Sequence, residues 1–337
     1  RLNRSVLSSG VPPVDPKLLS DTIITASVIL GGLALGYYLR KAGRLPESAA
    51  NPINRFALIV VQPLVIALAL WMMKPVDWQA LLLPLYGIVL ILAMWPVSAW
   101  VGRSIGLDRP SLGTFVSGSM FSNVGFTFGT FIAYMAMGPQ GAALGALYCV
   151  SFMPSFFTLG FYAGRYYSPT AEGNMWQALR QQFLDPATRN PVLGIVAGLA
   201  LNALHVAPPP HSNEIISIAM PATTLSYLLA IGLGLHLSAV REYWRECLLL
   251  HVSKFVISPA LGLLLAIPFG YWLGADRSNL AIVFIEASAP VAIMSVMLAE
   301  MCTLNPKLAG ALWITTNVTA VFLAPVVLIV ARMLMHA

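Results

Sequence analysis

Ten apolar stretches follow one another along this chain, and they constrain its fold more than any other feature. A helix needs about 20 residues to cross the hydrocarbon core of a bilayer. Only 9% of the residues are charged, against roughly 25% in soluble domains. We therefore expect an all-α polytopic membrane protein with ten transmembrane helices. The predicted spans are residues 18–39, 54–73, 80–101, 111–136, 141–165, 190–206, 214–238, 247–273, 278–302 and 307–334.

The basic residues are unevenly distributed over the two sides of this topology. Thirteen of the 19 Lys and Arg residues fall on one side and six on the other. Because Lys and Arg accumulate in cytoplasmic loops, we expect both termini outside the cell. Lys254 falls near a predicted inner end, where we expect it to extend to the interface. The same rule accounts for the net charge of +6, so the lipid bilayer is the expected partner and nucleic acid is not.

The motifs of common enzyme classes are missing from the sequence. It has no GxSxG elbow, HExxH pair or P-loop, and no loop is long enough for a nucleotide-hydrolysing domain. The cysteines, Cys149, Cys247 and Cys302, lie in or near apolar segments without metal-ligand spacing. We expect neither a disulfide nor a cysteine metal centre, no enzymatic activity, and no cofactor other than a coupling ion.

Two of the predicted spans contain residues that interrupt a helix. Residues 119–130 hold Ser122, Asn123 and Gly125 where a spanning helix would have large apolar side chains, and Pro290 lies inside the span at 278–302. Interrupted helices at matching positions of two halves are the best sequence indication of a transporter's binding site. We predict that spans four and nine are broken near the middle of the bilayer.

The two halves of the chain can be aligned. The long connection at 166–189 leaves five spans on each side, and matching Gly145–Leu147 to Gly310–Leu312 gives an offset of 165 residues that places Asn123 on Ser288. The two interruptions then coincide. Because five is an odd number, the second half is inserted upside down, and the sequence predicts two inverted five-helix repeats with a site near their axis.

A cation site is predicted from oxygen ligands near the interruptions. A carboxylate at the bilayer centre costs about 2.5–3.5 kcal/mol on insertion scales, so Glu286 is expected to be functional; the alternative is a protonated carboxyl that joins helices. Ser122 and Asn123 offer oxygen ligands beside carbonyls freed by the break, although small residues there also permit close helix packing. The predicted Na⁺ ligands are Ser122, Asn123, Ser151 and Glu286.

An anion site is predicted from the half-helices that begin after the interruptions. Pro290 removes a backbone donor and ends its helix, and Gly125 can do the same in the first half. The N-terminus of each following half-helix carries a partial positive charge, which suits a carboxylate. The predicted substrate-binding residues are Asn123, Gly125, Thr127, Ser288 and Pro290.

Several stretches resemble the auxin efflux carrier family, the bacterial relatives of the plant PIN-FORMED carriers in the bile/arsenite/riboflavin transporter superfamily. These stretches are residues 36–48, 54–63, 123–126, 137–144, 289–300 and 308–316. Ser122-Asn123-Val124 is also similar to the sodium-site motif in the fourth helix of bile acid:sodium symporters, and Glu286 to the glutamate of their ninth helix. The Gln that follows that glutamate in the symporters has no counterpart here, where Ala289-Pro290 stands.

The resemblance implies an elevator-type fold. Residues 1–73 and 190–238 would form a scaffold, often the interface of a homodimer, and residues 80–165 and 247–334 a moving core, with 166–189 as a cytoplasmic loop. It also implies an organic anion as substrate, bound where spans four and nine cross. We expect a secondary active transporter of a small carboxylate, coupled to Na⁺. An H⁺-coupled or uncoupled carrier and a membrane sensor that binds an anion without moving it are the alternatives.

Overall fold

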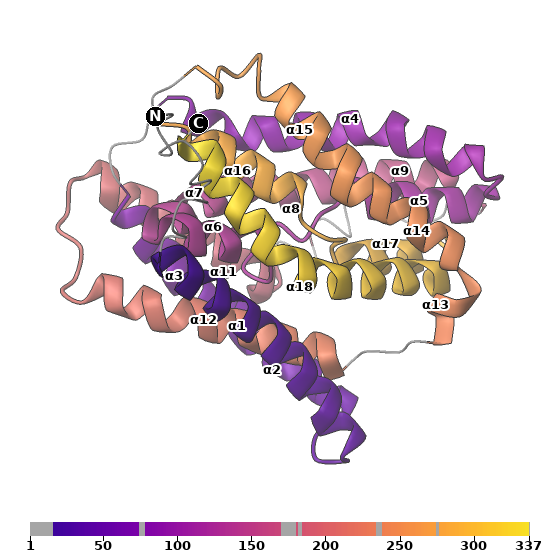
Figure 1. The fold of residues 1–337 in the computed structure, drawn as a ribbon, viewed down its shortest axis with the longest axis horizontal. Helices are drawn as coiled ribbons and strands as arrows, with labels where there is room; N and C mark the ends of the chain where they lie inside the picture. Colours follow the sequence, from indigo (N-terminus) through magenta and orange to yellow (C-terminus); the bar gives the residue numbers. More distant parts are fainter. Residues whose placement is uncertain are drawn as a thin grey trace, which may run out of the picture.

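The computed structural model describes residues 16–73, 78–169, 180, 184–233, 238–273 and 276–336, and within them the chain is helical without a β-strand (Figure 1). Seven helices in this part are long and apolar enough to cross a bilayer, which indicates a membrane-embedded all-α protein. Of the three remaining predicted spans, 111–136 and 278–302 each contain two shorter helices, and 190–206 overlaps one 18-residue helix.

The helices carry the labels of Figure 1. In chain order they are α1 (Pro16–Lys41), α2 (Ala50–Phe56), α3 (Gln62–Trp71), α4 (Leu83–Ser104), α5 (Arg109–Met120), α6 (Gly129–Met137), α7 (Pro139–Cys149), α8 (Phe152–Ser155), α9 (Phe161–Tyr167), α11 (Pro186–Ala203), α12 (Ser212–Leu233), α13 (Ser238–Glu242), α14 (Trp244–Val252), α15 (Ser258–Leu265), α16 (Ser278–Ala287), α17 (Met294–Met301) and α18 (Pro306–His336). Short 3₁₀ turns at Glu47–Ala49 and Ala80–Leu82 precede α2 and α4.

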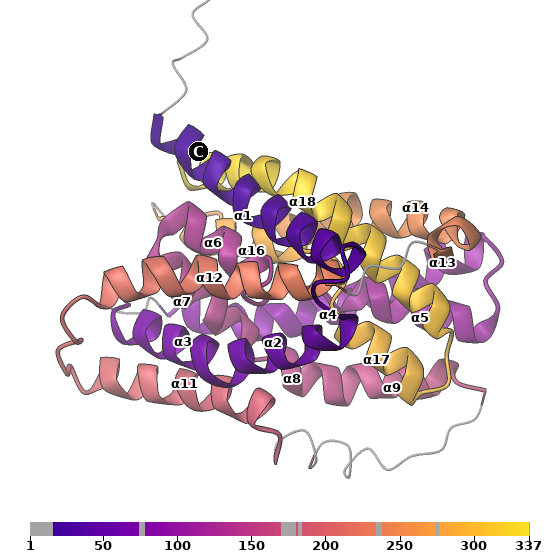
Figure 2. The same cartoon turned by 90° about the horizontal axis from the view of Figure 1, so that it is seen from below.

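Helices α1 and α12 lie side by side along most of their length (Figure 2). Glycines at their contact let the two backbones approach closely, as small residues do in membranes. A Cβ added to Gly36 would be 2.1 Å from the carbonyl oxygen of Leu229, and one added to Gly232 would be 2.3 Å from that of Leu33. Helices α3 and α11 pack together in the same way. These four helices belong to the segments that the family resemblance assigns to the scaffold.

Three helices contain a turn of π-helix close to a proline. The turns are Ala57–Val61 before Pro63, Phe156–Gly160 after Pro154, and Ser253–Ile257 before Pro259. A proline cannot donate the backbone hydrogen bond of a regular α-helix, and a wider turn accommodates the mismatch. Such bulges occur often at functional sites. The third one contains Lys254, whose side chain lies in the site described below.

The two expected interruptions are present. Helix α5 ends at Met120 and α6 begins at Gly129, while α16 ends at Ala287 and α17 begins at Met294. Gly129 and Met294 differ by 165 residues, which is the offset of the sequence alignment. The interruptions therefore occupy equivalent places in the aligned halves.

The segments between these half-helices, residues 121–128 and 288–293, meet in an antiparallel pairing of Ser122 with Val291. The amide of Asn123 donates to the carbonyl of Pro290 at 2.7 Å, and the amide of Ala292 donates to that of Phe121 at 3.0 Å. We call these two paired segments the crossover. Non-helical backbone inside a membrane must have its hydrogen bonds satisfied by protein, and this pairing satisfies part of them.

Candidate functional site

Side chains of α18 hold the crossover in place. Thr316 Oγ1 accepts a hydrogen bond from the amide of Val291 at 3.2 Å, and Asn317 Nδ2 donates to the carbonyl of Val291 at 2.9 Å. Asn123 Nδ2 donates to Asn317 Oδ1 at 3.3 Å. The side-chain amide of Asn123 is thus bound to α18, and α18 fixes both segments of the crossover.

One face of the first crossover segment is open. Ser122 and Val124 are buried, whereas Asn123, Gly125 and Thr127 are partly exposed. A Cβ added to Gly125 would meet no atom within 4 Å. Three of the five residues predicted to bind the substrate are therefore partly accessible. We call Asn123, Gly125 and Thr127 the open face.

The other two predicted substrate residues are buried. Ser288 is 4% exposed, and its hydroxyl donates to the carbonyl of Phe284 at 2.7 Å. Pro290 contributes its carbonyl to the backbone pairing with Asn123. Both residues therefore lie on the inside of the crossover, and Pro290 is bonded there to Asn123 of the open face.

The sequence predicts that the first backbone amides of α6 face a bound anion, and the structure shows another arrangement. The amide of Gly129 donates to the carbonyl of Asn123, and that of Thr130 donates to the carbonyls of Val124 and Gly125. The chain turns back on itself before α6, so the crossover segment itself accepts these hydrogen bonds. The first amides of α6 are already used within the protein.

Lys254 is the site residue that the sequence analysis misplaced. It is 0% exposed, so the expectation that it extends to the interface is wrong. Its Nζ donates to the Ser122 hydroxyl and, at 3.4 Å, to the carbonyl of Ser119. The part of the chain that the structure describes contains no salt bridge to Lys254. A cationic side chain is thus enclosed next to the crossover with neutral oxygens as its partners.

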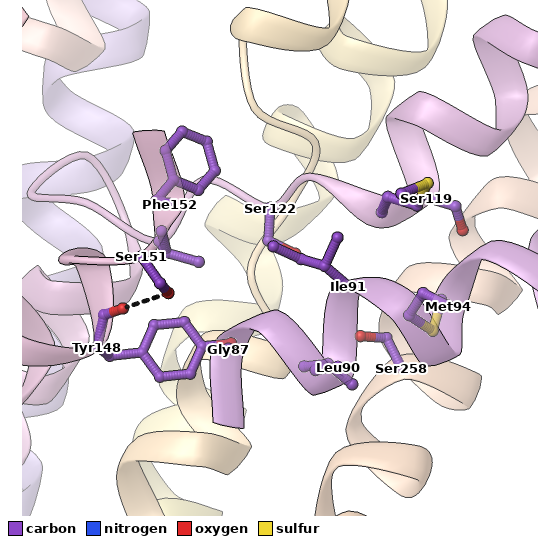
Figure 3. A pocket seen from close by; sticks show the side chains of 12 residues that line it. Gly87, Leu90, Ile91, Met94, Ser119, Ser122, Tyr148, Ser151, Phe152 and Ser258 are labelled. Atoms are coloured by element: carbon purple, nitrogen blue, oxygen red, sulfur yellow. Dashed lines mark hydrogen bonds between the residues drawn. The ribbon is translucent and has the colours of Figure 1, made fainter. Parts of the chain in front are cut away.

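A small cavity of about 20 Å³ lies beside Ser122 (Figure 3). This volume is about that of one water-sized probe. Ser122 and Ser151, both predicted Na⁺ ligands, line it together with residues of α4, α5, α7, α8, α15 and the crossover. The full lining is Gly87, Leu90, Ile91 and Met94 of α4, Ser119 and Met120 of α5, Ser122 and Val124 of the crossover, and Tyr148, Ser151, Phe152 and Ser258.

Glu286 lies apart from that cavity, against the beginning of α6. It is 0% exposed, and within the described residues neither carboxylate oxygen has a hydrogen-bond partner. A Cβ added to Gly129 would be 1.9 Å from Oε2 of Glu286, so the carboxyl group in this position occupies the space that a larger residue at 129 would need. An ionised carboxylate without partners is very costly to bury. Glu286 is therefore suited to bind a proton or a metal cation.

The predicted Na⁺ ligands consequently divide into three places. Ser122 and Ser151 line the small cavity, Asn123 binds Asn317, and Glu286 faces Gly129. The signal that identifies Glu286 from the sequence, an ionisable residue shortly before a proline in an apolar run, also applies to Lys254.

Neither a scan against models of protein families nor a search of curated proteins finds a match for this chain. The functional interpretation therefore depends on the chemistry of the crossover and of the groups around it.

Proposed function

We propose that this protein is a secondary active transporter of a small organic anion, which binds at the open face of the crossover. One observation carries the proposal: Lys254 and Glu286, two fully buried groups of opposite charge type, lie near the crossover without a salt bridge between them in the described part of the chain. Within the described residues, neither group has a charged partner of its own. A substrate anion and a coupling cation would supply the two missing charges.

The anionic character of the substrate follows from Lys254. Its amine contacts Ser122, the residue next to Asn123 of the open face. In a medium of low dielectric constant a charge acts over a longer distance than in water, so a carboxylate at the open face lies within the field of the ammonium group. Asn123, Gly125 and Thr127 would then contact the substrate, and Lys254 would act on it through space.

The coupling cation is proposed to bind at Glu286. The sequence favours Na⁺, which takes carboxylate, hydroxyl and carbonyl oxygens. The hydrogen bond from Lys254 to Ser122 favours a proton as the second candidate, because an ammonium group at this hydroxyl repels a second cation there. A proton needs only the carboxyl group of Glu286. The resemblance to the auxin efflux carriers points to the same class of substrate and leaves both ions open.

The rest of the proposal concerns how the site is carried across the membrane. We propose that α1–α3, α11 and α12 form a scaffold, which also provides the interface of a homodimer, and that the helices bearing the crossover move against it in an elevator-type cycle. The two halves are proposed to be inverted repeats. The chain would lie in a bacterial inner membrane with both termini outside.

The test begins with thermal unfolding of the purified protein in the presence of a set of small carboxylates, with and without Na⁺ and at several pH values. The same measurements are made on Glu286→Gln. We expect at least one carboxylate to stabilise the parent protein, and Na⁺ or acid to strengthen that effect only when Glu286 is present. Equal Na⁺ effects in both proteins contradict a sodium site at Glu286, and a Na⁺-independent effect of pH selects the proton.

Counterflow in proteoliposomes then separates transport from sensing. A radiolabelled form of the stabilising carboxylate is added outside vesicles that hold the unlabelled compound. Accumulation of label above equilibrium is expected for a carrier. Binding without counterflow would refute transport and leave the sensor.

A further inference from the structure

Five residues with hydroxyl groups line the small cavity beside Ser122, which Figure 3 shows from close by: Ser119, Ser122, Tyr148, Ser151 and Ser258. Two of these hydroxyls are engaged with short hydrogen bonds. Ser258 Oγ donates to the carbonyl of Ala287 at 2.7 Å, and Ser119 Oγ shares a hydrogen bond of 2.5 Å with Ser253 Oγ. The other three hydroxyls decide what the cavity can hold.

These three hydroxyls have protons to donate. Ser122 Oγ accepts from Lys254 Nζ, and because a hydroxyl both donates and accepts, that bond leaves the proton of Ser122 unused. Ser151 Oγ reaches only the carbonyl of Tyr148, at the long distance of 3.4 Å. The phenol of Tyr148 has no hydrogen-bond partner among the described residues. Three O–H donors without a good acceptor therefore line one enclosed space.

A buried cation lies behind one of these donors. Lys254 is 0% exposed, and its partners are the neutral oxygens of Ser122 and Ser119. A hydroxyl that accepts from an ammonium group is polarised and becomes a stronger donor on its other side. The ammonium group also repels a cation placed in the cavity. A water molecule could use the three donors, but it would leave the charge of Lys254 without a counterion, which is costly in a buried place.

The volume of the cavity limits the anion to a very small one. About 20 Å³ accommodates one water-sized particle, which excludes carboxylates and phosphates. Gly87 of α4 keeps this space open: a Cβ added there would be 3.1 Å from Ser151 Oγ and 3.4 Å from Cζ of Tyr148. Figure 3 shows the ring of Tyr148 reaching toward Gly87. A single-atom anion matches both the size and the donors.

We infer that this cavity binds one halide ion, held by the hydroxyls of Ser122, Tyr148 and Ser151 as the counterion of Lys254. The inference assigns Ser122 and Ser151, which the sequence predicts as Na⁺ ligands, to an anion. The site itself does not require transport. Its effect on the carboxylate rests on the proposed function: a halide beside Lys254 reduces the positive field at the open face, so halide and carboxylate compete for one charge.

Thermal unfolding of the purified protein without any carboxylate tests the site. Chloride replaces methanesulfonate, a larger anion, at fixed Na⁺ concentration and ionic strength. A ligand that binds the folded state raises the unfolding temperature in a saturable way, and we expect a rise of a few degrees. Gly87→Ala narrows the cavity and Ser151→Ala removes a donor, so each should raise the half-saturating chloride concentration about tenfold.

Ser98→Ala is the matched control for these variants. Ser98 is also buried on α4, but its hydroxyl donates to the carbonyl of Met94 at 2.6 Å and does not line the cavity. It should keep the chloride response of the parent protein. A response that does not saturate is a general salt effect, and such a response overturns the inference. The same response in Gly87→Ala and Ser151→Ala as in the parent also overturns it.

Crystals grown in bromide locate the ion directly. An anomalous difference peak is expected between Ser122 and Ser151 in the parent protein and is expected to be absent in Gly87→Ala. A parent crystal in which the cavity has no bromide peak contradicts the inference.

Equilibrium binding of a carboxylate, measured in chloride and in methanesulfonate, separates this site from the proposed function. Chloride should lower carboxylate affinity several-fold in the parent protein and have no effect in Lys254→Met. Lys254-dependent carboxylate binding without a saturable chloride effect would refute the halide site and leave the proposed function standing. A saturable chloride effect that depends on Gly87 and Ser151, in a protein that binds no carboxylate, would give the reverse result. Carboxylate affinity that chloride does not change would refute the shared counterion.

Discussion

Replacement of Gly129 by alanine tests the placement of Glu286 against α6. The added Cβ would lie 1.9 Å from Oε2 and 2.6 Å from the carboxyl carbon, whereas ordinary contacts begin at 3.4 Å. Backbone or side chain must therefore shift by more than an ångström. Overpacking of this kind costs about 1–3 kcal/mol. In a Glu286→Ala background the obstructing carboxyl group is absent, and alanine is favoured over glycine within a helix by about 0.5–1 kcal/mol.

The expected signature is a coupling energy of about 2 kcal/mol between the two positions. Four proteins are compared by thermal unfolding in one detergent: the parent, Gly129→Ala, Glu286→Ala and the double variant. Gly129→Ala should lower the apparent unfolding temperature by a few degrees in the parent and leave it equal or higher in the Glu286→Ala background. Gly125→Ala is the matched control, since its Cβ meets no atom within 4 Å. Equal destabilisation by Gly129→Ala in both backgrounds would refute the contact.

Three further substitutions separate stability from binding. Lys254→Met should change the unfolding free energy little, because apolar replacement of buried charge is often tolerated. Carboxylate affinity should fall about 30-fold, since a charge about 8 Å away at an effective dielectric constant of about 20 contributes about 2 kcal/mol. Unchanged affinity in equilibrium binding would exclude Lys254 from anion recognition. Thr316→Val leaves the amide of Val291 without its acceptor and should cost about 1–3 kcal/mol in thermal unfolding, and Thr316→Ser should restore most of it. Gly125→Leu fills the open face and should abolish carboxylate binding with an unfolding temperature near that of the parent; retained binding would place the substrate elsewhere.

The helix interruptions were predictable because their causes are local. Pro290 removes a backbone donor in the middle of a predicted span, and the polar residues around Asn123 are out of place in another. The partners across the crossover were not predictable. The sequence offset sets Asn123 opposite Ser288, but the segments pair antiparallel, so the amide of Asn123 meets Pro290 and Ser122 pairs with Val291. Alignment of the two halves identifies residues at equivalent positions. It does not identify the residues in contact, because contacts depend on how the two segments cross.

The ionisable residues illustrate the same limit. Glu286 could be recognised from its chain neighbours, yet its contact with Gly129 arises from segments more than 150 residues apart. Lys254 was misplaced because the span ends alone suggested an interfacial position. It lies in the π-helical turn at Ser253–Ile257, and its acceptors are the carbonyl of Ser119 in α5 and the hydroxyl of Ser122 in the crossover. No local pattern around Lys254 encodes those acceptors.

Charge balance gives the final prediction. With Lys254 charged and Glu286 ionised, the empty site has no net charge, and it again has none when it holds both an anion and a cation. A site that holds only one of them carries a net charge, and moving a net charge through a membrane is costly. The transmembrane potential also opposes or drives that movement, by about 2.3 kcal/mol per elementary charge per 100 mV. This difference favours movement of the empty and the fully loaded forms, which is the requirement for coupled transport.

Glu286→Gln changes that balance in a defined way. The anion-loaded site becomes neutral without a cation, while the empty site keeps the charge of Lys254. Counterflow, in which the site crosses loaded in both directions, should therefore persist and lose its dependence on Na⁺ or pH. Net uptake, which requires return of the empty site, should be slowed strongly and become sensitive to an imposed potential. Proteoliposomes with a potassium diffusion potential measure both modes in one preparation, and equal loss of counterflow and net uptake would show that Glu286 is needed for folding or substrate binding rather than for coupling.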